Sequence, residues 1–228
     1  MSRSPLLAAT AAIALVAGSA SVTAQPMGAF TGLKVNPVVR DFPGMTVLYN
    51  QNRDGDGYSV NSQIYDLTYT SGVYTVYNDQ AADDFVVPQG RTWKVTEIDV
   101  TGSGSGTPAS ENVYFYWNDQ GRPGKPVKGG SFTNLNGSGD PDFAIRLRKG
   151  VRLRAGHYWV SVQANCAPFL GCSEWDWATT ATIANHEAIW EQPDNAYNTG
   201  CRSWHVLEHC FGSAYAGDFM FALKGRRG

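Results

Sequence analysis

The chain has 228 residues, and its 18 Lys and Arg against 20 Asp and Glu give a net charge of −2. A balance this close to neutral argues against nucleic acid as a general partner. The 25 glycines, an aromatic share of 12% and a charged share of only 17% favour a turn-rich all-β domain over a helical one.

Residues 1–24 have the pattern of a secretory signal peptide. Arg3 supplies the basic start, residues 6–17 form an apolar stretch, and Val22-Thr23-Ala24 provides a small-residue cleavage site. The apolar stretch is shorter than the roughly 20 residues that a transmembrane helix needs, and no comparable run follows. We therefore expect a secreted or periplasmic protein with no transmembrane segment.

Three further regions follow in chain order. Residues 25–44 are rich in Gly and Pro and lack a sustained hydrophobic period, which predicts an extended N-terminal arm. Residues 45–224 form the predicted domain, and 225–228 are a short basic tail. Alternating or continuous apolar patterns predict strands at 45–49, 64–69, 73–77, 85–87, 91–101, 113–117, 143–148, 151–154, 157–164 and 218–223, with 64–69 and 73–77 forming a hairpin.

The segment 91–101 carries an irregularity. Its apolar positions change parity between Val95 and Ile98, and strand side chains alternate with a period of two. One extra residue is needed to keep both on the same face, so we predict a β-bulge near Thr96 and Glu97.

Four short motifs resemble a recurrent, mostly uncharacterised domain of secreted bacterial proteins. They are Gln80-Ala81-Ala82-Asp83-Asp84-Phe85 followed by Pro88, Thr92-Trp93, Tyr158-Trp159-Val160-Ser161-Val162-Gln163-Ala164-Asn165, and Thr199-Gly200-Cys201-Arg202-Ser203-Trp204. The resemblance spans residues 49–223 and implies a jelly-roll-like fold with no known activity. Together with the composition, it predicts a single jelly-roll-like antiparallel β-sandwich.

All four cysteines lie in the last third of the chain, at Cys166, Cys172, Cys201 and Cys210. In an exported protein we expect them to be bridged. Three connectivities are possible, and we favour the two local ones, Cys166 with Cys172 and Cys201 with Cys210. The segment 165–217 that contains them is too long for an unstructured loop, and we interpret it as the functional surface on a rigid scaffold.

Residues 52–57 resemble the first half of a calcium-binding loop, because oxygen-bearing side chains stand at alternate positions before Gly57. The twelfth position, which holds a Glu in an EF-hand, is Gln63. Only another kind of structural Ca²⁺ site fits, completed by carboxylates from 79–84; otherwise these residues simply build turns. The predicted ligands are Asn52, Asp54, Asp56, Asp79 and Asp83.

Trp175 and Trp177 lie two positions apart, so on an extended segment both indoles project to one side. Such a pair can stack on sugar rings while Asp176 or Glu174 binds their hydroxyl groups. The alternative is that the rings fill the end of the sandwich core.

Two sequence patterns could indicate catalysis. Asp83 and Asp84 could be paired carboxylates, but neighbours on a strand point to opposite faces and would not converge on one bond. His205-Val206-Leu207-Glu208-His209 spells a zinc-peptidase pattern, yet no Glu follows His209 to complete the ligand set.

The sequence-based hypothesis is a secreted, non-enzymatic protein that binds a glycan or an envelope polymer through Trp175, Asp176 and Trp177. One alternative is a structural or adhesion-type surface protein that contacts other proteins. Another is a metal-dependent hydrolase that uses His205, Glu208 and His209. Structural Ca²⁺ is the one cofactor that the sequence suggests.

Overall fold

The structure is a computed structural model that describes residues 45–65, 74–167 and 171–228. The predicted signal peptide and arm lie outside this part, as does most of the predicted 64–77 hairpin. Of the hairpin's second arm, Thr75–Tyr77 forms a 3₁₀ helix, η1, instead of the predicted strand. No helix within the described ranges has the length and apolar character needed to cross a membrane.

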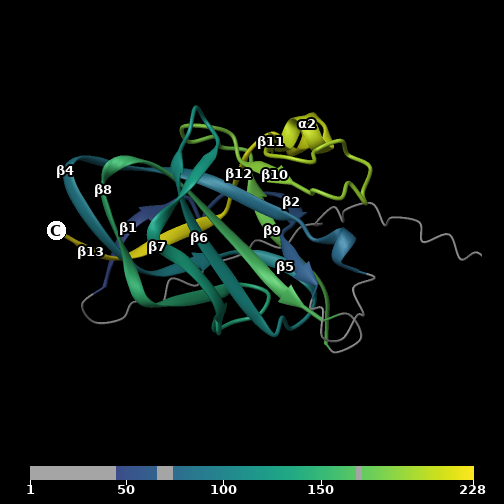
Figure 1. The fold of residues 1–228 in the computed structure, drawn as a ribbon, viewed down its shortest axis with the longest axis horizontal. Coiled ribbons are helices and arrows are strands. Elements are labelled where there is room, and N and C mark those ends of the chain that lie inside the picture. The colour runs from purple at the N-terminus through teal and green to yellow at the C-terminus, as the bar shows by residue number, and fades with distance from the viewer. Residues whose placement is uncertain (1–44, 66–73, 168–170) are drawn as a thin grey trace, which may run out of the picture.

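Two β-sheets make up the fold (Figure 1). The larger sheet contains β1 (Thr46–Asn50), β3 (Gln63–Tyr65), β4 (Gln80–Val100), β6 (Ser110–Asn118), β7 (Pro123–Leu135), β8 (Phe143–Cys166), β10 (Ile189–Glu191), β11 (His205–Val206) and β13 (Phe221–Arg227). The smaller sheet contains β2 (Gly55–Asn61), β5 (Gly102–Gly106), β9 (Cys172–Thr180) and β12 (Asp218–Phe219). This arrangement confirms the predicted antiparallel β-sandwich.

The main path of the larger sheet runs β1-β13-β4-β8-β6-β7. Beyond the end of β13, β10 takes the place beside β4 and pairs in turn with β11. In the smaller sheet, β9 lies between β12 and β2 and also pairs with β5. Every strand pair is antiparallel except β3 with β8, which is parallel.

The predicted β-bulge is confirmed. Between Glu97 and Val95 the pairing of β4 with β13 shifts register, because β13 advances by only one residue, from Lys224 to Gly225, which leaves Thr96 as the extra residue. After the shift, Ile98 returns to the buried face together with Val95.

Several predicted strand boundaries are corrected. The strands expected at 85–87 and 91–101 are both part of β4, with an irregularity between them where pairing resumes at Thr92 after Val87. The segments 143–148, 151–154 and 157–164 are parts of one strand, β8, because each of them pairs with β4. The predicted tail also belongs to the sheet, since β13 continues through Arg227.

The main core lies between the two sheets. Trp177 of β9 stacks on Phe219 at a centroid distance of 4.7 Å and meets the edge of Phe221, from the larger sheet, at 6.1 Å. Phe85 contacts Phe115 and Tyr158 within the same core. Burial of large aromatic side chains is the main favourable contribution to such a sandwich.

A second, smaller apolar cluster lies apart from this core. It contains Ala82, Trp159 and Ile189, with Tyr116 and Trp204 packed against it. The short helix α2 (Leu207–Phe211) and strands β10 and β11 lie together at one end of the molecule, away from the C-terminus (Figure 1). The segment leading into β10 therefore runs beside the N-terminal half of β4.

Candidate metal centre

Three chain segments bring a carboxylate and two imidazoles together beside the smaller apolar cluster. Asp84 comes from β4, His157 from β8, and His186 from the segment before β10. One ligand atom from each of the three lies within 4.8 Å of the other two. We call this group the Asp-His-His site.

Strand alternation explains why Asp84 and not Asp83 belongs to the site. Asp83 accepts hydrogen bonds from Gln51 Nε2 and the Phe219 N–H, both at 2.6 Å. Asp84 points the opposite way, toward His157. The two adjacent carboxylates thus lie on opposite faces of β4, as strand geometry requires.

Asp84 is the anchor of the site. Its Oδ2 lies 2.6 Å from His157 Nε2 and accepts the backbone N–H of His186 at 3.1 Å. Its Oδ1 accepts Asn185 Nδ2 at 3.2 Å. The carboxylate thereby fixes both the histidine of β8 and the backbone of the segment that carries His186.

Aromatic rings hold the imidazoles side by side. The His157 and His186 rings are nearly parallel, with centroids 5.1 Å apart and an interplanar angle of 7°. The Trp159 indole is parallel to His186 at 6.3 Å and donates Nε1–H to Asn118 Oδ1. Asn118 also accepts the Gly121 N–H, so the β6–β7 turn packs against the His186 ring.

The site runs from the interior to the surface. Asp84 is buried, His157 is half-buried and His186 is exposed. Burial raises the pKa of the Asp84 carboxyl above its ordinary value, while hydrogen bonds from His157 and Asn185 oppose part of the rise. The inner side is therefore shielded from water, and the His186 side is open to solvent.

This donor set suits a divalent transition metal. Imidazole favours Zn²⁺, Cu²⁺, Ni²⁺ and Fe²⁺, and two His with one carboxylate form a three-ligand zinc site that leaves a fourth position open. Hydrogen bonds of the kind that Asp84 receives from Asn185 and His186 orient metal-binding carboxylates.

Binding of a metal ion would require the side chains of the site to move. Tetrahedral ligands at about 2.0–2.2 Å from Zn²⁺ lie roughly 3.3 Å apart. The Asp84–His157 contact of 2.6 Å is a hydrogen bond, so a bound ion would replace the shared proton, and the two side chains would separate by under about 1 Å. The stacked His157 and His186 rings lie at an interplanar angle of 7°, so at least one ring must also rotate to direct its nitrogen lone pair at the same ion.

The structure gives Trp175 and Trp177 a core role instead of the predicted sugar platform. Their exposed fractions are 1% and 0%, so neither ring presents a face to a ligand. Trp175 Nε1 donates to Pro141 O and Trp177 Nε1 to Met220 O. Asp176 is also buried and accepts Asn61 Nδ2 at 3.0 Å. Sequence spacing placed both indoles on one side, but that side faces the other sheet.

The five predicted calcium ligands are dispersed over separate contacts. Asn52 accepts a hydrogen bond from the Thr101 hydroxyl, and Asp56 accepts hydrogen bonds from the Thr179 hydroxyl and the Tyr58 N–H. Asp79 accepts the Gln63 N–H, and Asp83 accepts Gln51 Nε2 and the Phe219 N–H. Asp54 is exposed, with a backbone φ of 56°. Among His, Cys, Asp and Glu of the described ranges, the Asp-His-His site is the one potential metal-binding group of three. Bound Ca²⁺ stays a prediction, because the five predicted ligands make separate contacts instead of forming one group.

His205, Glu208 and His209 do not share a helix. His205 belongs to β11, whereas Glu208 and His209 lie on the five-residue helix α2. The two imidazoles stack at 4.7 Å, and the Glu208 N–H is bonded to Glu187. Desolvation, His209 and Arg122 lower the pKa of His205. No third ligand joins them within the part of the chain that the structure describes.

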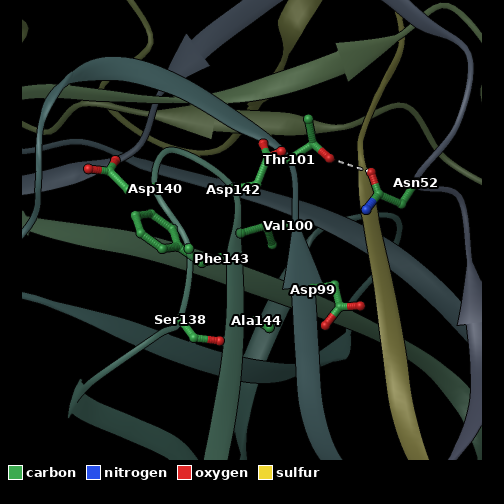
Figure 2. A pocket seen from close by; sticks show the side chains of 10 residues that line it. Asn52, Asp99, Val100, Thr101, Ser138, Asp140, Asp142, Phe143 and Ala144 are labelled. Carbon is green, nitrogen blue, oxygen red and sulfur yellow. Dashed lines mark hydrogen bonds between the residues drawn. The ribbon is translucent and has the colours of Figure 1, made fainter. Parts of the chain in front are cut away.

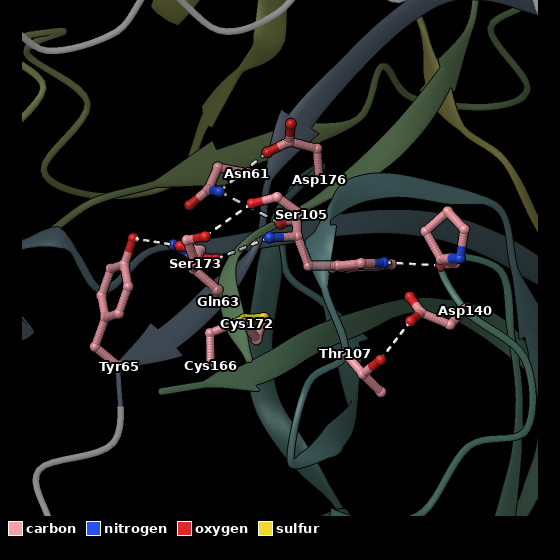
Figure 3. Close-up of a disulfide and its surroundings, with 12 residues drawn as sticks. Asn61, Gln63, Tyr65, Ser105, Thr107, Asp140, Cys166, Cys172, Ser173 and Asp176 are labelled. Atoms are coloured by element: carbon pink, nitrogen blue, oxygen red, sulfur yellow. Dashed lines mark hydrogen bonds between the residues drawn. A yellow bond between two sulfur atoms is a disulfide. The ribbon is translucent and has the colours of Figure 1, made fainter. Parts of the chain in front are cut away.

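Both local disulfides are confirmed, Cys166–Cys172 and Cys201–Cys210. Figure 3 shows the first of them beside Gln63 and Tyr65, where β3, β8 and β9 meet. The second closes the loop before α2 and places Leu207 and Phe211 against the core. The two bridges fix the long segment at each end, and His186 lies between them.

Sequence reasoning missed the Asp-His-His site. Alternation along β4 and β8 places Asp84 and His157 on the same face, which was a usable signal. No such sequence signal predicts the position of His186, because that position depends on the pairing of β10 with β4.

Comparisons with protein-family models, with curated proteins and with solved structures found no match. The resemblance to the secreted bacterial domain stays a prediction.

Proposed function

We propose that this protein is an exported β-sandwich that binds a divalent transition metal ion through Asp84, His157 and His186. The observation that carries the proposal is the convergence of these three ligand atoms within 4.8 Å, from segments far apart in the chain. Two disulfides support an oxidising, extracytoplasmic location.

We propose binding rather than catalysis because neither the cavity at Tyr49–Arg53 nor the cavity at Asp99–Thr101 includes any of the three residues. The exposed His186 leaves room for water or for one donor from a partner in the fourth coordination position. A metal ion shared with an envelope polymer would connect this site with the ligand class suggested by the sequence.

The four histidines of the chain provide a matched test. Mature protein is stripped with a chelator, and Zn²⁺ binding is measured by calorimetry in the native protein, in His157→Asn/His186→Asn and in His205→Asn/His209→Asn. We expect one Zn²⁺ per chain in the native protein and in the second variant, and loss of this binding in the first. Near-UV circular dichroism checks that each variant is folded.

Co²⁺ provides a direct spectroscopic readout at the same site. Imidazole and carboxylate coordination should give visible d–d absorption in the native protein that is lost in His157→Asn/His186→Asn. Absence of stoichiometric metal in the native protein, or retention of metal by a folded His157→Asn/His186→Asn variant, would overturn the proposal. Loss only in His205→Asn/His209→Asn would move the site to the predicted peptidase motif.

A further inference from the structure

A lysine and two carboxylates lie together on the larger sheet, where β13 pairs with β4. Lys224 of β13 lies directly opposite Glu97 of β4, and Asp99 follows two positions later on β4. Because strand side chains alternate, all three project from the same face of the sheet. Diagonal neighbours on paired strands are within reach of a long side chain, so the lysine can contact both carboxylates.

All three side chains are buried and in contact. The exposed fractions of Lys224, Glu97 and Asp99 are 2%, 0% and 3%. Lys224 Nζ donates a hydrogen bond to Glu97 Oε1 at 3.1 Å and lies 2.5 Å from Asp99 Oδ2. The second contact lacks the alignment of a hydrogen bond. The lysine nitrogen therefore touches the Asp99 carboxyl group, with which it can form an amide, without an oriented N–H between them.

Burial favours the uncharged forms of this lysine and this aspartate. Desolvation raises the pKa of the Asp99 carboxyl from 3.8 to about 6, although Lys224 opposes part of the rise. Transfer of one proton from Nζ to Asp99 gives an amine beside a carboxylic acid. Glu97 Oε2 also accepts Arg146 Nε at 3.3 Å, so Glu97 keeps a cationic partner when the charges of Lys224 and Asp99 disappear together.

We propose that Lys224 and Asp99 become joined by an isopeptide bond in the folded protein. The neutral amine attacks Cγ of the protonated Asp99 carboxyl group and forms the C–N bond. Glu97, which is in contact with Nζ, takes one proton from the nitrogen and passes it to the departing hydroxyl group. The C–O bond breaks and one water molecule leaves, so the reaction needs no oxidant, reductant or cofactor. The ion pair of the structure is the reactant state of this condensation.

The fold supplies the conditions that the condensation requires. Fixing two reacting groups in contact gives effective concentrations far above those reached in solution, of the order of 10⁵ M or more for well-oriented pairs. Exclusion of water limits the reverse hydrolysis. Asp99 also lines a cavity of about 150 Å³ with Asn52 and Ala144 (Figure 2), which is large enough to receive the released water.

The bond would connect the last strand of the fold to a central one. In the larger sheet, β13 lies between β1 and β4. A covalent link at Lys224 would prevent β13 from separating from β4, even where the hydrogen bonds between them are broken. An exported protein would gain resistance to unfolding in this way, in addition to its two disulfides.

Mass spectrometry of the mature protein, denatured and with its disulfides reduced, tests the proposal directly. The intact mass should be lower than the mass calculated from the sequence by one water molecule. Peptide mapping should recover one branched peptide that joins the Lys224 segment to the Asp99 segment. The calculated mass together with two separate peptides would overturn the proposal. The mass of the native protein decides this even where a variant fails to fold.

Three variants assign the reacting groups. Lys224→Arg keeps the cation but should show no loss of water, and Glu97→Gln should show none because its amide cannot carry the proton. Lys94→Arg, at an exposed lysine of the same strand pair, is the matched control and should keep the bond. Loss of water in Lys224→Arg would place the link elsewhere and overturn the proposal. A complete bond in folded Glu97→Gln would remove Glu97 from the reaction.

Mass also separates this proposal from the two other interpretations of these residues. Lys224→Met removes the ion pair and the bond together, so its loss of stability does not distinguish them, whereas the mass of the native protein does. His157→Asn/His186→Asn should retain the branched peptide, because neither histidine belongs to this group. The isopeptide bond and the metal site therefore succeed or fail separately.

Discussion

Asp84 Oδ2 and His157 Nε2 lie 2.6 Å apart across the paired strands β4 and β8, although 73 positions separate the two residues in the chain. The same carboxylate oxygen accepts the backbone N–H of His186. A single buried group therefore organises both histidines of the proposed metal site. This relationship makes the site testable through folding as well as through binding.

Metal should stabilise the native protein by linkage, because the three ligands converge only in the folded state. At a free Zn²⁺ concentration of 100 times Kd, the free energy of unfolding should rise by about 2.7 kcal/mol. The rise is measured by thermal or urea unfolding with Zn²⁺ and with excess chelator. The His186→Asn variant is the control and should show a smaller rise. An equal rise in that variant would place the stabilising metal elsewhere.

Replacing Trp177 or Trp175 by Ala should destabilise the fold by about 3–5 kcal/mol, because each change leaves a cavity in the sandwich core. Each also leaves a carbonyl oxygen, of Met220 or Pro141, without its indole donor. Urea unfolding measures the change. Trp117→Ala is the matched control: Trp117 is 45% exposed, and its removal should cost much less. Near-native stability of both core variants would restore the surface-platform interpretation.

Lys224→Met should destabilise the protein by about 3 kcal/mol or more, because it leaves Glu97 and Asp99 buried without their shared cation. Adding Asp99→Asn to this variant should recover part of the loss by removing one buried charge. Free energies of unfolding of the two single variants and the double variant give the coupling between the residues. Additive effects would contradict a shared network.

Stability should fall as pH rises through the range set by Glu111. Burial raises the pKa of this carboxyl from 4.5 to about 7, although the Gly137 N–H bonds to it. Because the folded-state pKa is the higher one, its contribution is fully present below about pH 4.5 and is lost as pH rises through about 7.

Glu111→Gln should flatten this part of the stability profile by on the order of 1 kcal/mol, allowing for solvent screening. Unfolding in urea at a series of pH values between these two limits measures the effect. A native profile in the variant would show that other buried carboxylates, such as Asp176 and Glu191, whose pKa values burial also raises to about 7, dominate this range.

Local rules determined much of this protein from its sequence. Alternation placed Asp83 and Asp84 on opposite faces, and the change of parity after Val95 located the bulge near Thr96 and Glu97. Short sequence separations, of six and nine residues, favoured the two disulfides that form. These features depend on neighbours within a few positions, where backbone geometry leaves few alternatives.

Only the tertiary structure decided which faces are covered and which distant groups meet. Trp175 and Trp177 share a side in either interpretation, but contact with the opposite sheet turns that side into core. His186 reaches Asp84 because β10 pairs with β4 at a register that no local pattern encodes. Burial and long-range strand pairing are properties of the assembled sheets, and the chemistry of the Asp-His-His site arises there.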